Sequence, residues 1–268
     1  MTTPGPESDF KLLAISVGNT RTSFGVFSGD RLDHAASEDN QRFDELLAAI
    51  LADARSIEDA ETRAVVCATV NPAFSDSLIA ALEKELDAPV RAMVDDLPIA
   101  IEHSLGPDHT TGQDRLLVAL GAFDGLKQAC VVIDAGTAIT VDFVDGTGVF
   151  HGGAIAPGTQ LMLDALAERT AALPVLEATP PAAGDPYGKT TPDAMRTGVY
   201  AAARGLVRVM LDEYAESYGA YPSVIATGGG AASLFDGEPL VERIVPHLVL
   251  SGIAVSVREV LRCDDDDA

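Results

Sequence analysis

Cysteine is scarce in this sequence, and its spacing excludes the roles that it most often fills in small stapled domains. The three cysteines, Cys67, Cys130 and Cys263, lie far apart and form no Cys-x-x-Cys pair. An odd number of widely spaced cysteines argues against a disulfide framework and against a zinc site. Cys67 and Cys130 instead lie in the apolar runs AVVCATV and ACVVIDA, which indicate buried strands.

Basic residues are also few. Lys and Arg number 18 against 41 Asp and Glu, which gives a formal net charge of -23. Such a field repels phosphate backbones and anionic lipids, so we expect neither nucleic acid nor a membrane surface as a partner. A small anionic substrate stays possible, because backbone N–H groups and a bound cation can create a local positive site. Only four of the basic residues are lysines, which fits adaptation to high salt and equally an arginine-favouring genome.

Long apolar runs are absent. No stretch approaches 18 apolar residues, and the start, MTTPGPESDF, contains no apolar core of signal-peptide length. We therefore expect a cytoplasmic protein. With 268 residues, 47% of them hydrophobic, the chain can bury a core as one large domain or two modest ones. Residues 1–10 and 264–268 are expected to be flexible ends.

Several catalytic motifs are missing as well. GxGxxG after the first strand, GxSxG and HExxH do not occur, and none of the five histidines has metal-ligand spacing to another. Gly188-Lys189-Thr190 resembles the end of a P-loop, but only three residues separate Gly184 from Gly188, and no strand-like run precedes them. The spacing therefore excludes a P-loop kinase.

What the sequence does contain is a regular alternation of strand-like and helical segments. Apolar runs such as LLAISV, RAVVCATV, CVVIDA and SVIATG alternate with helical patterns such as FDELLAAILADA and DRLLVALGAFDGL. This alternation predicts an α/β protein whose sheet is covered by helices.

The chain also repeats itself. Residues 14–20 match residues 132–138 at an offset of 118, which places Thr22 over Thr140, and residues 66–69 resemble residues 225–227. Two copies of one unit predict a pseudo-symmetric molecule of two similar halves with a central cleft. We set the halves at residues 11–118 and 119–263.

Two glycine turns at corresponding places in the repeat are candidates for phosphate binding. Gly18-Asn19-Thr20, followed by Arg21, lets the backbone approach a phosphate closely, although Asn and Gly also form ordinary hairpin turns. The second turn follows Asp134, a carboxylate at the end of a buried strand, where it needs a partner or a cation. Together the turns suggest a clamp on nucleotide phosphates, with a metal that neutralises charge.

Two further segments have both a functional and a structural interpretation. Gly228-Gly229-Gly230 follows the VIAT strand and either offers a flat surface to an adenosine or forms a flexible connection. Gly112-Gln113-Asp114-Arg115 precedes an apolar helix. There, Asp114 is either a residue that stabilises the helix N-terminus or a base beside an anion-binding guanidinium.

Seven motifs in order give the chain a resemblance to the type III pantothenate kinases over about residues 12–235. They are SVGNT, GQDR, DAGTA, GGAIAPGTQLMLDAL, RTAALP, GKTTPDAMRTG and VIATGGGA. The resemblance implies a duplicated actin-like (ribonuclease H-like) ATPase fold and a homodimer. It also implies transfer of the γ-phosphate of ATP to pantothenate, which gives 4'-phosphopantothenate for coenzyme A biosynthesis.

The resemblance implies roles for individual residues as well. Asp114 would be the catalytic base, Mg2+ would accompany ATP, and Asp134 would hold a monovalent cation, K+ or NH4+. The residues expected to bind pantothenate are Gly112, Gln113, Arg115, Thr191 and His103. Those expected to bind ATP are Ser16, Gly18, Asn19, Thr20, Arg21, Thr22, Ser23, Thr137, Gly228 and Gly229.

Two positions depart from the family's pattern. The family's first phosphate turn begins with Asp, whereas this chain has Ser16, whose hydroxyl brings no formal charge to a metal site. The family commonly has a tyrosine shortly before Gly-x-Asp-Arg, and here His103 is nearest in position. Ser16 keeps open a relative that binds nucleotide or pantothenate without efficient turnover. A third hypothesis is a different actin-fold phosphotransferase, such as a sugar or acetate kinase.

Overall fold

The structure is a computed structural model that describes residues 10–86, 88–182 and 186–266. Its contacts divide the chain into two compact units. The first contains the chain as far as Glu102, then Gly106–Gly125, and the segment that starts at His247. The second contains His103–Leu105 and Leu126–Pro246. Each unit has a sheet and a core of its own.

The first unit is built on a five-stranded sheet in the order β3-β2-β1-β4-β5. Strands β1, β2 and β3 form antiparallel hairpins, whereas β4 runs parallel to β1 and β5 parallel to β4. The strands are β1 (Phe10–Val17), β2 (Arg21–Ser28), β3 (Arg31–Asp39), β4 (Thr62–Thr69) and β5 (Arg91–Ala92). The helices are α1 (Phe43–Ser56), α2 (Pro72–Leu86), α3 (Gln113–Leu126) and α7 (Leu248–Asp266).

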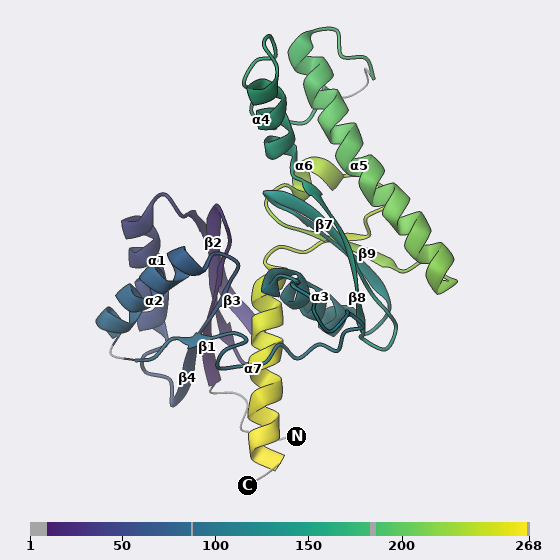
Figure 1. The fold of residues 1–268 in the computed structure, drawn as a ribbon. Helices are drawn as coiled ribbons and strands as arrows, with labels where there is room; N and C mark the ends of the chain where they lie inside the picture. Colours follow the sequence, from purple (N-terminus) through teal and green to yellow (C-terminus); the bar gives the residue numbers. More distant parts are fainter. Residues whose placement is uncertain (1–9, 87, 183–185, 267–268) are drawn as a thin grey trace. The chain divides into compact units, whose positions relative to one another are not determined.

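Alternation along β1 gives this sheet two buried faces. Leu13 and Ile15 pack with residues of α1 and α2, while Leu12 and Ala14 pack with residues of α3 and α7 such as Leu117. In Figure 1, α1 and α2 accordingly lie on one side of this sheet and the yellow helix α7 on the other. Burial on both faces explains why β1 and β4 are near-continuous apolar runs.

The second unit contains a sheet of the same design, in the order β8-β7-β6-β9-β10. Again the first three strands are antiparallel and the last two run parallel to their neighbours. The strands are β6 (Cys130–Ala135), β7 (Ala138–Val144), β8 (Phe150–Pro157), β9 (Ser223–Thr227) and β10 (Arg243–Ile244). The helices are α4 (Thr159–Arg169), α5 (Thr191–Tyr218) and α6 (Ala231–Phe235), of which α5 and α6 pack on the sheet.

The internal repeat predicted from the sequence is confirmed. Strand β1 occupies the same central place in its sheet as β6 does in the other, and β4 corresponds to β9. This is the duplicated actin-like α/β fold that the sequence predicts. The alignment of Thr22 with Thr140 is wrong by one residue. Ser16 pairs with Ser23, whereas Asp134 pairs with Thr140, because the second turn is one residue shorter.

The predicted limits of the halves differ from the two units. The boundaries 11–118 and 119–263 gave the last helix to the second half, whereas in the structure α7 packs against β1 and β2 of the first unit. Strand β1 begins at Phe10 and α7 continues to Asp266, so both elements overlap the predicted end segments 1–10 and 264–268. Residues 1–9 and 267–268 lie outside the described part of the chain.

The buried cysteines agree with their apolar sequence context. Cys67 and Cys130 are both free thiols, and burial raises the pKa of each to about 12. They therefore stay protonated and pack as small apolar side chains. None of the helices in the described ranges combines the length and the apolar character needed to cross a membrane.

Candidate active site

The first glycine turn closes tightly between β1 and β2. The Gly18 amide donates a hydrogen bond to the carbonyl oxygen of Arg21 (3.0 Å), and a β-carbon at position 18 would lie 2.8 Å from that oxygen. The turn therefore requires glycine where it closes. Asn19 and Thr20 are exposed at its tip, whereas the Arg21 side chain donates from Nε to the hydroxyl of Ser37 on β3 (3.2 Å).

Asn40, which follows β3, holds this turn in place. Its side-chain nitrogen donates to the carbonyl oxygen of Gly18 (2.9 Å), and its amide donates to that of Thr20 (2.9 Å). Its Oδ1 accepts a hydrogen bond from the hydroxyl of Thr22 (2.8 Å), a side chain that is completely buried. Thr22 therefore differs from the exposed residues Asn19 and Thr20, because its buried hydroxyl is bonded to Asn40.

The Gly-x-Asp-Arg motif forms the start of α3. A β-carbon at Gly112 would come 2.5 Å from Oδ1 of Asp114, so the absence of a side chain there leaves the room that the carboxylate occupies. Oδ1 also accepts a hydrogen bond from the backbone amide of Arg115 (2.8 Å). Asp114 is partly exposed at the positive end of the helix dipole. This position suits both a helix-stabilising residue and a proton acceptor.

The glycine turn and the start of α3 meet at one edge of the first sheet. The amide of Val70 donates to the carbonyl oxygen of Val17, the residue before Gly18 (3.0 Å). Val70 directly follows β4, and at the last residue of β4 the amide of Thr69 donates to Oε1 of Gln113 (3.4 Å). The carboxyl ends of β1 and β4 thus connect the predicted phosphate turn with the predicted base. Ligands of α/β sheets bind at this kind of edge.

Ser16, where the resemblance noted in the sequence predicts an Asp, lies near the same edge. It pairs with Ser23 of β2 and with Ala68 of β4. Alternation along β1 places its side chain on the face of Leu12 and Ala14, which is the face that α3 and α7 cover. The substituted residue is therefore on the same face of the sheet as the helix that begins with the predicted base.

In the second unit, Gly228 packs directly against the carboxylate of Asp134. A β-carbon at position 228 would overlap Oδ1 of Asp134 and would lie 2.6 Å from the carbonyl oxygen of Ala135. Gly228 also has a φ of 89°, in the left-handed region that favours glycine. At Gly229 a β-carbon would meet nothing within 4 Å. The structure thus brings together the predicted cation ligand and a predicted ATP-binding glycine.

Asp134 is the cation ligand predicted from the sequence. Among the residues that the structure describes, no three or more His, Cys, Asp or Glu side chains form a cluster that could hold a metal ion. A cation at Asp134 would take its other ligands from backbone oxygens, water or substrate phosphates, which suits ions that prefer oxygen.

Gly158 supports the second turn much as Asn40 supports the first. Its amide donates to the carbonyl oxygen of Thr137 (2.8 Å), and a β-carbon at position 158 would lie 2.6 Å from that oxygen. The turn itself closes through a hydrogen bond from the Gly136 amide to the carbonyl oxygen of Ala138 (2.9 Å). Gly136 and Thr137 are exposed. Gly158 lies within the motif GGAIAPGTQLMLDAL, which by itself indicates no role for this glycine.

The predicted pantothenate-binding residues are divided between the two units. Gly112, Gln113 and Arg115 belong to the first unit, whereas His103 and Thr191 belong to the second. Thr191 is the exposed first residue of α5. The predicted halves, 11–118 and 119–263, already separated Thr191 from the other residues, but they placed His103 in the first half.

The segment around His103 is fastened to β8. His103 forms an isolated bridge with the first residue of that strand. The hydroxyl of Ser104 hydrogen-bonds Nδ1 of His151 (3.0 Å), whose Nε2 hydrogen-bonds Oδ2 of Asp145 (2.8 Å). Partial burial alone would raise the pKa of Asp145, but hydrogen bonds from His151 and Thr147 outweigh it and hold that pKa well below its usual value.

The segment that resembles a P-loop has a different use here. Thr190 caps the N-terminus of α5, where its hydroxyl oxygen accepts a hydrogen bond from the amide of Asp193 (3.3 Å). This agrees with the exclusion of a P-loop from the spacing, because a threonine at this place is an ordinary helix cap.

Comparison with solved structures agrees with the fold. A structure described as a conserved putative Baf family transcriptional activator from Campylobacter jejuni superposes with a TM-score of 0.59 at 16% identity. The match covers 93% of this chain and 99% of that one. At this identity the likeness shows the fold alone.

Sequence comparison goes further. The profile of the type III pantothenate kinase family matches residues 12–213. A type III pantothenate kinase of Thermus thermophilus is 34% identical over 247 residues, which cover 90% of this chain and 96% of that protein. One from Rhodospirillum rubrum is 34% identical over 253 residues, covering 91% and 96%. Because these matches extend over nearly the whole of both proteins, the chain belongs to the type III pantothenate kinase family.

Proposed function

We propose that this protein phosphorylates pantothenate with ATP and that Asp114 is the base of the reaction. The observation that carries the proposal lies within the first unit. The glycine turn Gly18–Arg21 and the N-terminus of α3 meet at the carboxyl edge of β1 and β4. One edge therefore offers backbone amides that can bind a phosphate and a carboxylate that can accept a proton.

The reaction needs positioning more than covalent chemistry by the protein. Asp114 accepts the proton of the primary hydroxyl of pantothenate while the hydroxyl oxygen attacks the γ-phosphorus. The bond from that phosphorus to the bridging oxygen breaks, ADP leaves with the electron pair, and 4'-phosphopantothenate forms. Gly112, Gln113 and Arg115 hold pantothenate in this proposal, with His103 and Thr191 as further contacts.

Residues of both glycine turns hold ATP in this proposal. Gly18, Asn19, Thr20 and Ser23, with Thr137 of the second unit, contact the phosphates, and Gly228 and Gly229 offer backbone to the adenosine. Arg21 is bound to Ser37 and Thr22 to Asn40, so we assign these two the task of fixing the turn. Support for the assignment comes from the exposure of Asn19, Thr20 and Thr137.

Two cations complete the site. Mg2+ enters with ATP, supplies charge neutralisation for the phosphates, and needs few protein ligands when phosphates provide the rest. Asp134 holds a monovalent cation, K+ or NH4+. The space against its carboxylate that a β-carbon at Gly228 would fill supports this assignment. Ser16 stands where the family places a carboxylate, and its hydroxyl is a weaker ligand for a hard cation.

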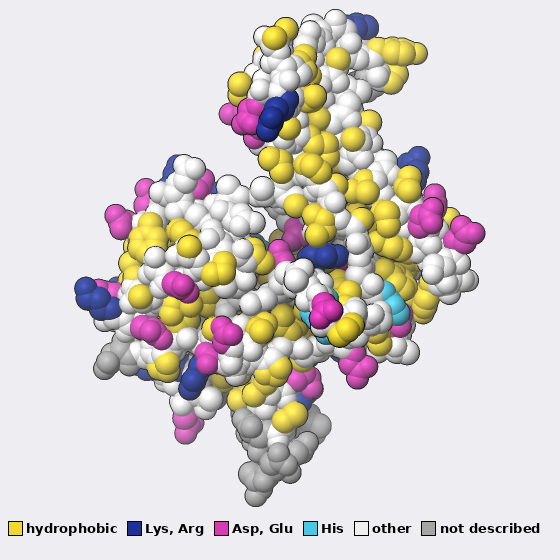
Figure 2. Space-filling model, in the orientation of Figure 1, with side chains coloured by type: hydrophobic (Ala, Val, Ile, Leu, Met, Phe, Trp, Pro, Cys, Tyr) yellow, Lys and Arg dark blue, Asp and Glu magenta, His cyan; other side chains and the backbone are white. Residues whose placement is uncertain are grey.

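We also propose that the protein is a homodimer. An open groove of about 610 Å³ between α4 and α5 is lined by apolar side chains that include Leu161, Met195 and Val199, and Leu161 is 44% exposed. Figure 2 shows hydrophobic side chains gathered over these helices. An exposed apolar surface of this kind favours association, and a second copy is the occupant that the family resemblance implies.

Light scattering tests the dimer. The protein is expected to have twice the mass of the chain, and Leu161→Glu should produce monomers. Val209→Glu is the matched control, because Val209 is 58% exposed on α5 and does not line the groove. A monomeric parent protein would refute this part of the proposal.

A substrate panel tests the reaction itself. ADP release should be measured with pantothenate, glucose and acetate, each with ATP, Mg2+ and K+. ADP release with pantothenate alone is expected. Release with glucose or acetate would favour another actin-fold phosphotransferase. Nucleotide binding without ADP release would favour a relative that has lost turnover, the alternative that Ser16 motivates. An ATP-consuming biosynthetic enzyme acts where ATP is held, so we place the protein in the cytoplasm.

A further inference from the structure

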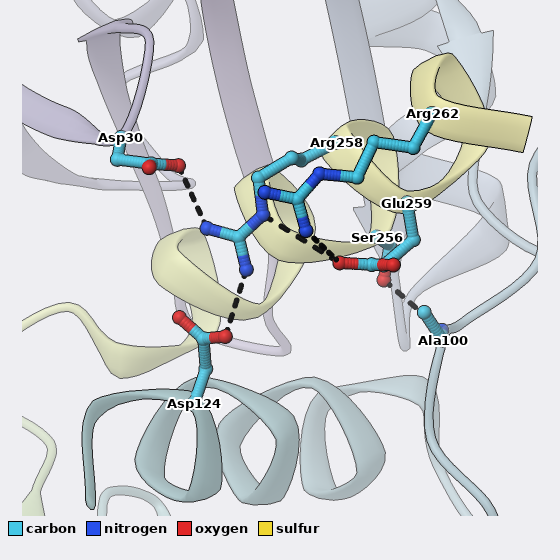
Figure 3. Close-up of polar contacts among 7 residues, drawn as sticks. All are labelled: Asp30, Ala100, Asp124, Ser256, Arg258, Glu259 and Arg262. Carbon is cyan, nitrogen blue, oxygen red and sulfur yellow. Dashed lines mark hydrogen bonds and ion pairs between the residues drawn. The ribbon is translucent and has the colours of Figure 1, made fainter. Parts of the chain in front are cut away.

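Arg258 of α7 joins two other parts of the first unit. Its guanidinium forms an ion pair with Oδ1 of Asp124 on α3 (2.7 Å) and a second with Oδ1 of Asp30 in the β2–β3 turn (2.7 Å). Figure 3 shows the guanidinium between these two carboxylates. The side chains of Arg258 and Asp124 are only 21% and 25% exposed, so their ion pair is shielded more than an ordinary surface pair, whereas Asp30 is 69% exposed.

The backbones of α3 and α7 also touch. A β-carbon at Gly252 of α7 would overlap the carbonyl oxygen of Leu117, and one at Gly121 of α3 would lie 2.5 Å from the carbonyl oxygen of Leu248. Two glycines thus let the helices approach without intervening side chains. Because packed backbone cannot yield as a flexible side chain can, α7 fixes the line along which α3 runs.

A third contact of α7 holds the chain before α3. Ser256 is fully buried, and its hydroxyl accepts a hydrogen bond from the amide of Ala100 (3.3 Å; Figure 3). The stretch 101–112 that follows contains neither a helix nor a strand and ends at Gly112, two residues before Asp114. Helix α7 therefore contacts the chain at Ala100, before α3, and at Gly121, within α3, and the proposed base lies between these two contacts.

The part of α3 between its backbone contact with α7 at Gly121 and the proposed base is short. Asp114 lies seven residues before Gly121, which corresponds to about 10 Å along a helix with a rise of about 1.5 Å per residue. A tilt of about 6° at that crossing would move the start of α3 by about 1 Å, and a misplacement of about 1 Å can cost phosphoryl transfer up to about 100-fold.

We propose that Arg258 and Ser256 are positioning residues for phosphoryl transfer. Arg258 acts through Asp124 and the axis of α3, and Ser256 acts through Ala100. Neither touches substrate; both fix the place of Asp114. This inference rests on the proposed role of Asp114 as the base.

Besides its ion pair with Glu259 of the same helix, Arg258 has the pairs with Asp124 and Asp30, and these two supply the test. Asp124→Asn and Asp30→Asn each remove one carboxylate that lies 2.7 Å from the same guanidinium, but Asp124 lies on α3 and is 25% exposed, whereas Asp30 lies in the β2–β3 turn and is 69% exposed. Asp124→Asn is expected to lower kcat about five-fold while the KM for ATP stays within two-fold, because misplacement weakens the transition state more than nucleotide binding. Asp30→Asn should leave kcat within two-fold. Asp124→Glu should restore most of the loss, and Ser256→Ala should lower kcat in the same selective way.

Thermal unfolding of each variant, and kcat of Asp114→Asn, complete the experiment. A kcat of Asp124→Asn equal to that of the parent protein would overturn the inference. So would equal losses of kcat in Asp124→Asn and Asp30→Asn that follow their melting temperatures, because α7 would then contribute stability only. A parent protein without turnover, or an Asp114→Asn variant with full kcat, would overturn the proposed function and this inference with it.

Discussion

Ser16 and Asp134 occupy equivalent positions in the two sheets. Each lies near the carboxyl end of the central strand, and each pairs across its hairpin with a hydroxyl residue, Ser23 for Ser16 and Thr140 for Asp134. The second unit therefore carries a carboxylate where the first carries a hydroxyl. The two halves of the repeated fold therefore differ in charge at this position.

Replacement of Ser16 by Asp should raise turnover. A carboxylate at this place adds a charged oxygen ligand for the Mg2+ of the ATP complex, and a gain of about 1.4 kcal/mol in transition-state stabilisation corresponds to a tenfold rate. We expect kcat of Ser16→Asp to rise by about tenfold, measured at several Mg2+ concentrations. Ser16→Asn, with a side chain of the same size as Asp, is the control for size without charge. Equal kcat in parent protein and Ser16→Asp would mean that the hydroxyl does not limit the reaction.

The carboxylate of Asp134 should be sensitive to its glycine neighbour. Gly228→Ala forces a β-carbon into Oδ1 of Asp134 at a φ of 89°, whereas Gly205→Ala, on α5, places a β-carbon where no atom lies within 4 Å. Gly228→Ala is expected to weaken activation by K+ and to raise the KM for ATP about tenfold or more, because the cation and ATP are both proposed to bind beside Gly228. Gly205→Ala is the control, and its KM for ATP should stay within about two-fold of that of the parent protein, because Gly205 is not part of the proposed site. Titration of activity with KCl separates the two, and identical titrations would remove Gly228 from the site.

The buried hydroxyl of Thr22 should matter for stability as well as for ATP. Thr22→Val keeps the shape but leaves Oδ1 of Asn40 without its donor, at a cost of about 1–3 kcal/mol. The Gly18–Arg21 turn then loses part of its support, so the KM for ATP should rise. Urea unfolding and steady-state kinetics measure the two effects. Thr22→Ser retains the hydroxyl and should show a smaller change in KM, and a KM for ATP unchanged in Thr22→Val would argue against support of the turn.

Asp53 of α1 should make the protein less stable as pH rises. Burial raises the pKa of its carboxyl, and His34, whose Nε2 is 3.7 Å from Oδ2, offsets this only in part. A raised pKa in the folded state means that stability is fully present below the unfolded value of 3.8 and is lost as pH rises through the folded value. Asp53→Asn should therefore melt higher than the parent protein at pH 7, with the difference vanishing below about pH 4.

Melting curves from pH 3 to pH 8 measure this effect, with Asp59→Asn as the control because Asp59 is exposed beyond the end of α1. A difference that grew toward low pH would show that the sign of the Asp53 contribution is the reverse.

More of the fold than of the contacts within the site could be predicted from the sequence. LLAISV and CVVIDA, each followed by a glycine turn, indicated the repeat, because a buried strand and a turn leave strong local signals. The one-residue difference between the turns could not be predicted, because an alignment at a constant offset allows no gap in the shorter turn. The packing of α7 on the first sheet could not be predicted either, because the local sequence of a helix does not indicate which distant sheet it packs on. Asn40 acts through hydrogen bonds to a turn on another strand, and a single asparagine has no pattern to reveal that.

The most direct measurement is the rate of 4'-phosphopantothenate formation, followed by mass spectrometry, in the parent protein and in Asp114→Asn at low and at molar salt. General-base catalysis typically contributes about 10²–10⁴-fold, so the account predicts product from the parent protein and a loss of that size in the variant, with ATP binding retained. Asp114→Asn acting as fast as the parent protein, or a folded parent protein that binds ATP and makes no product at either salt concentration, would contradict it.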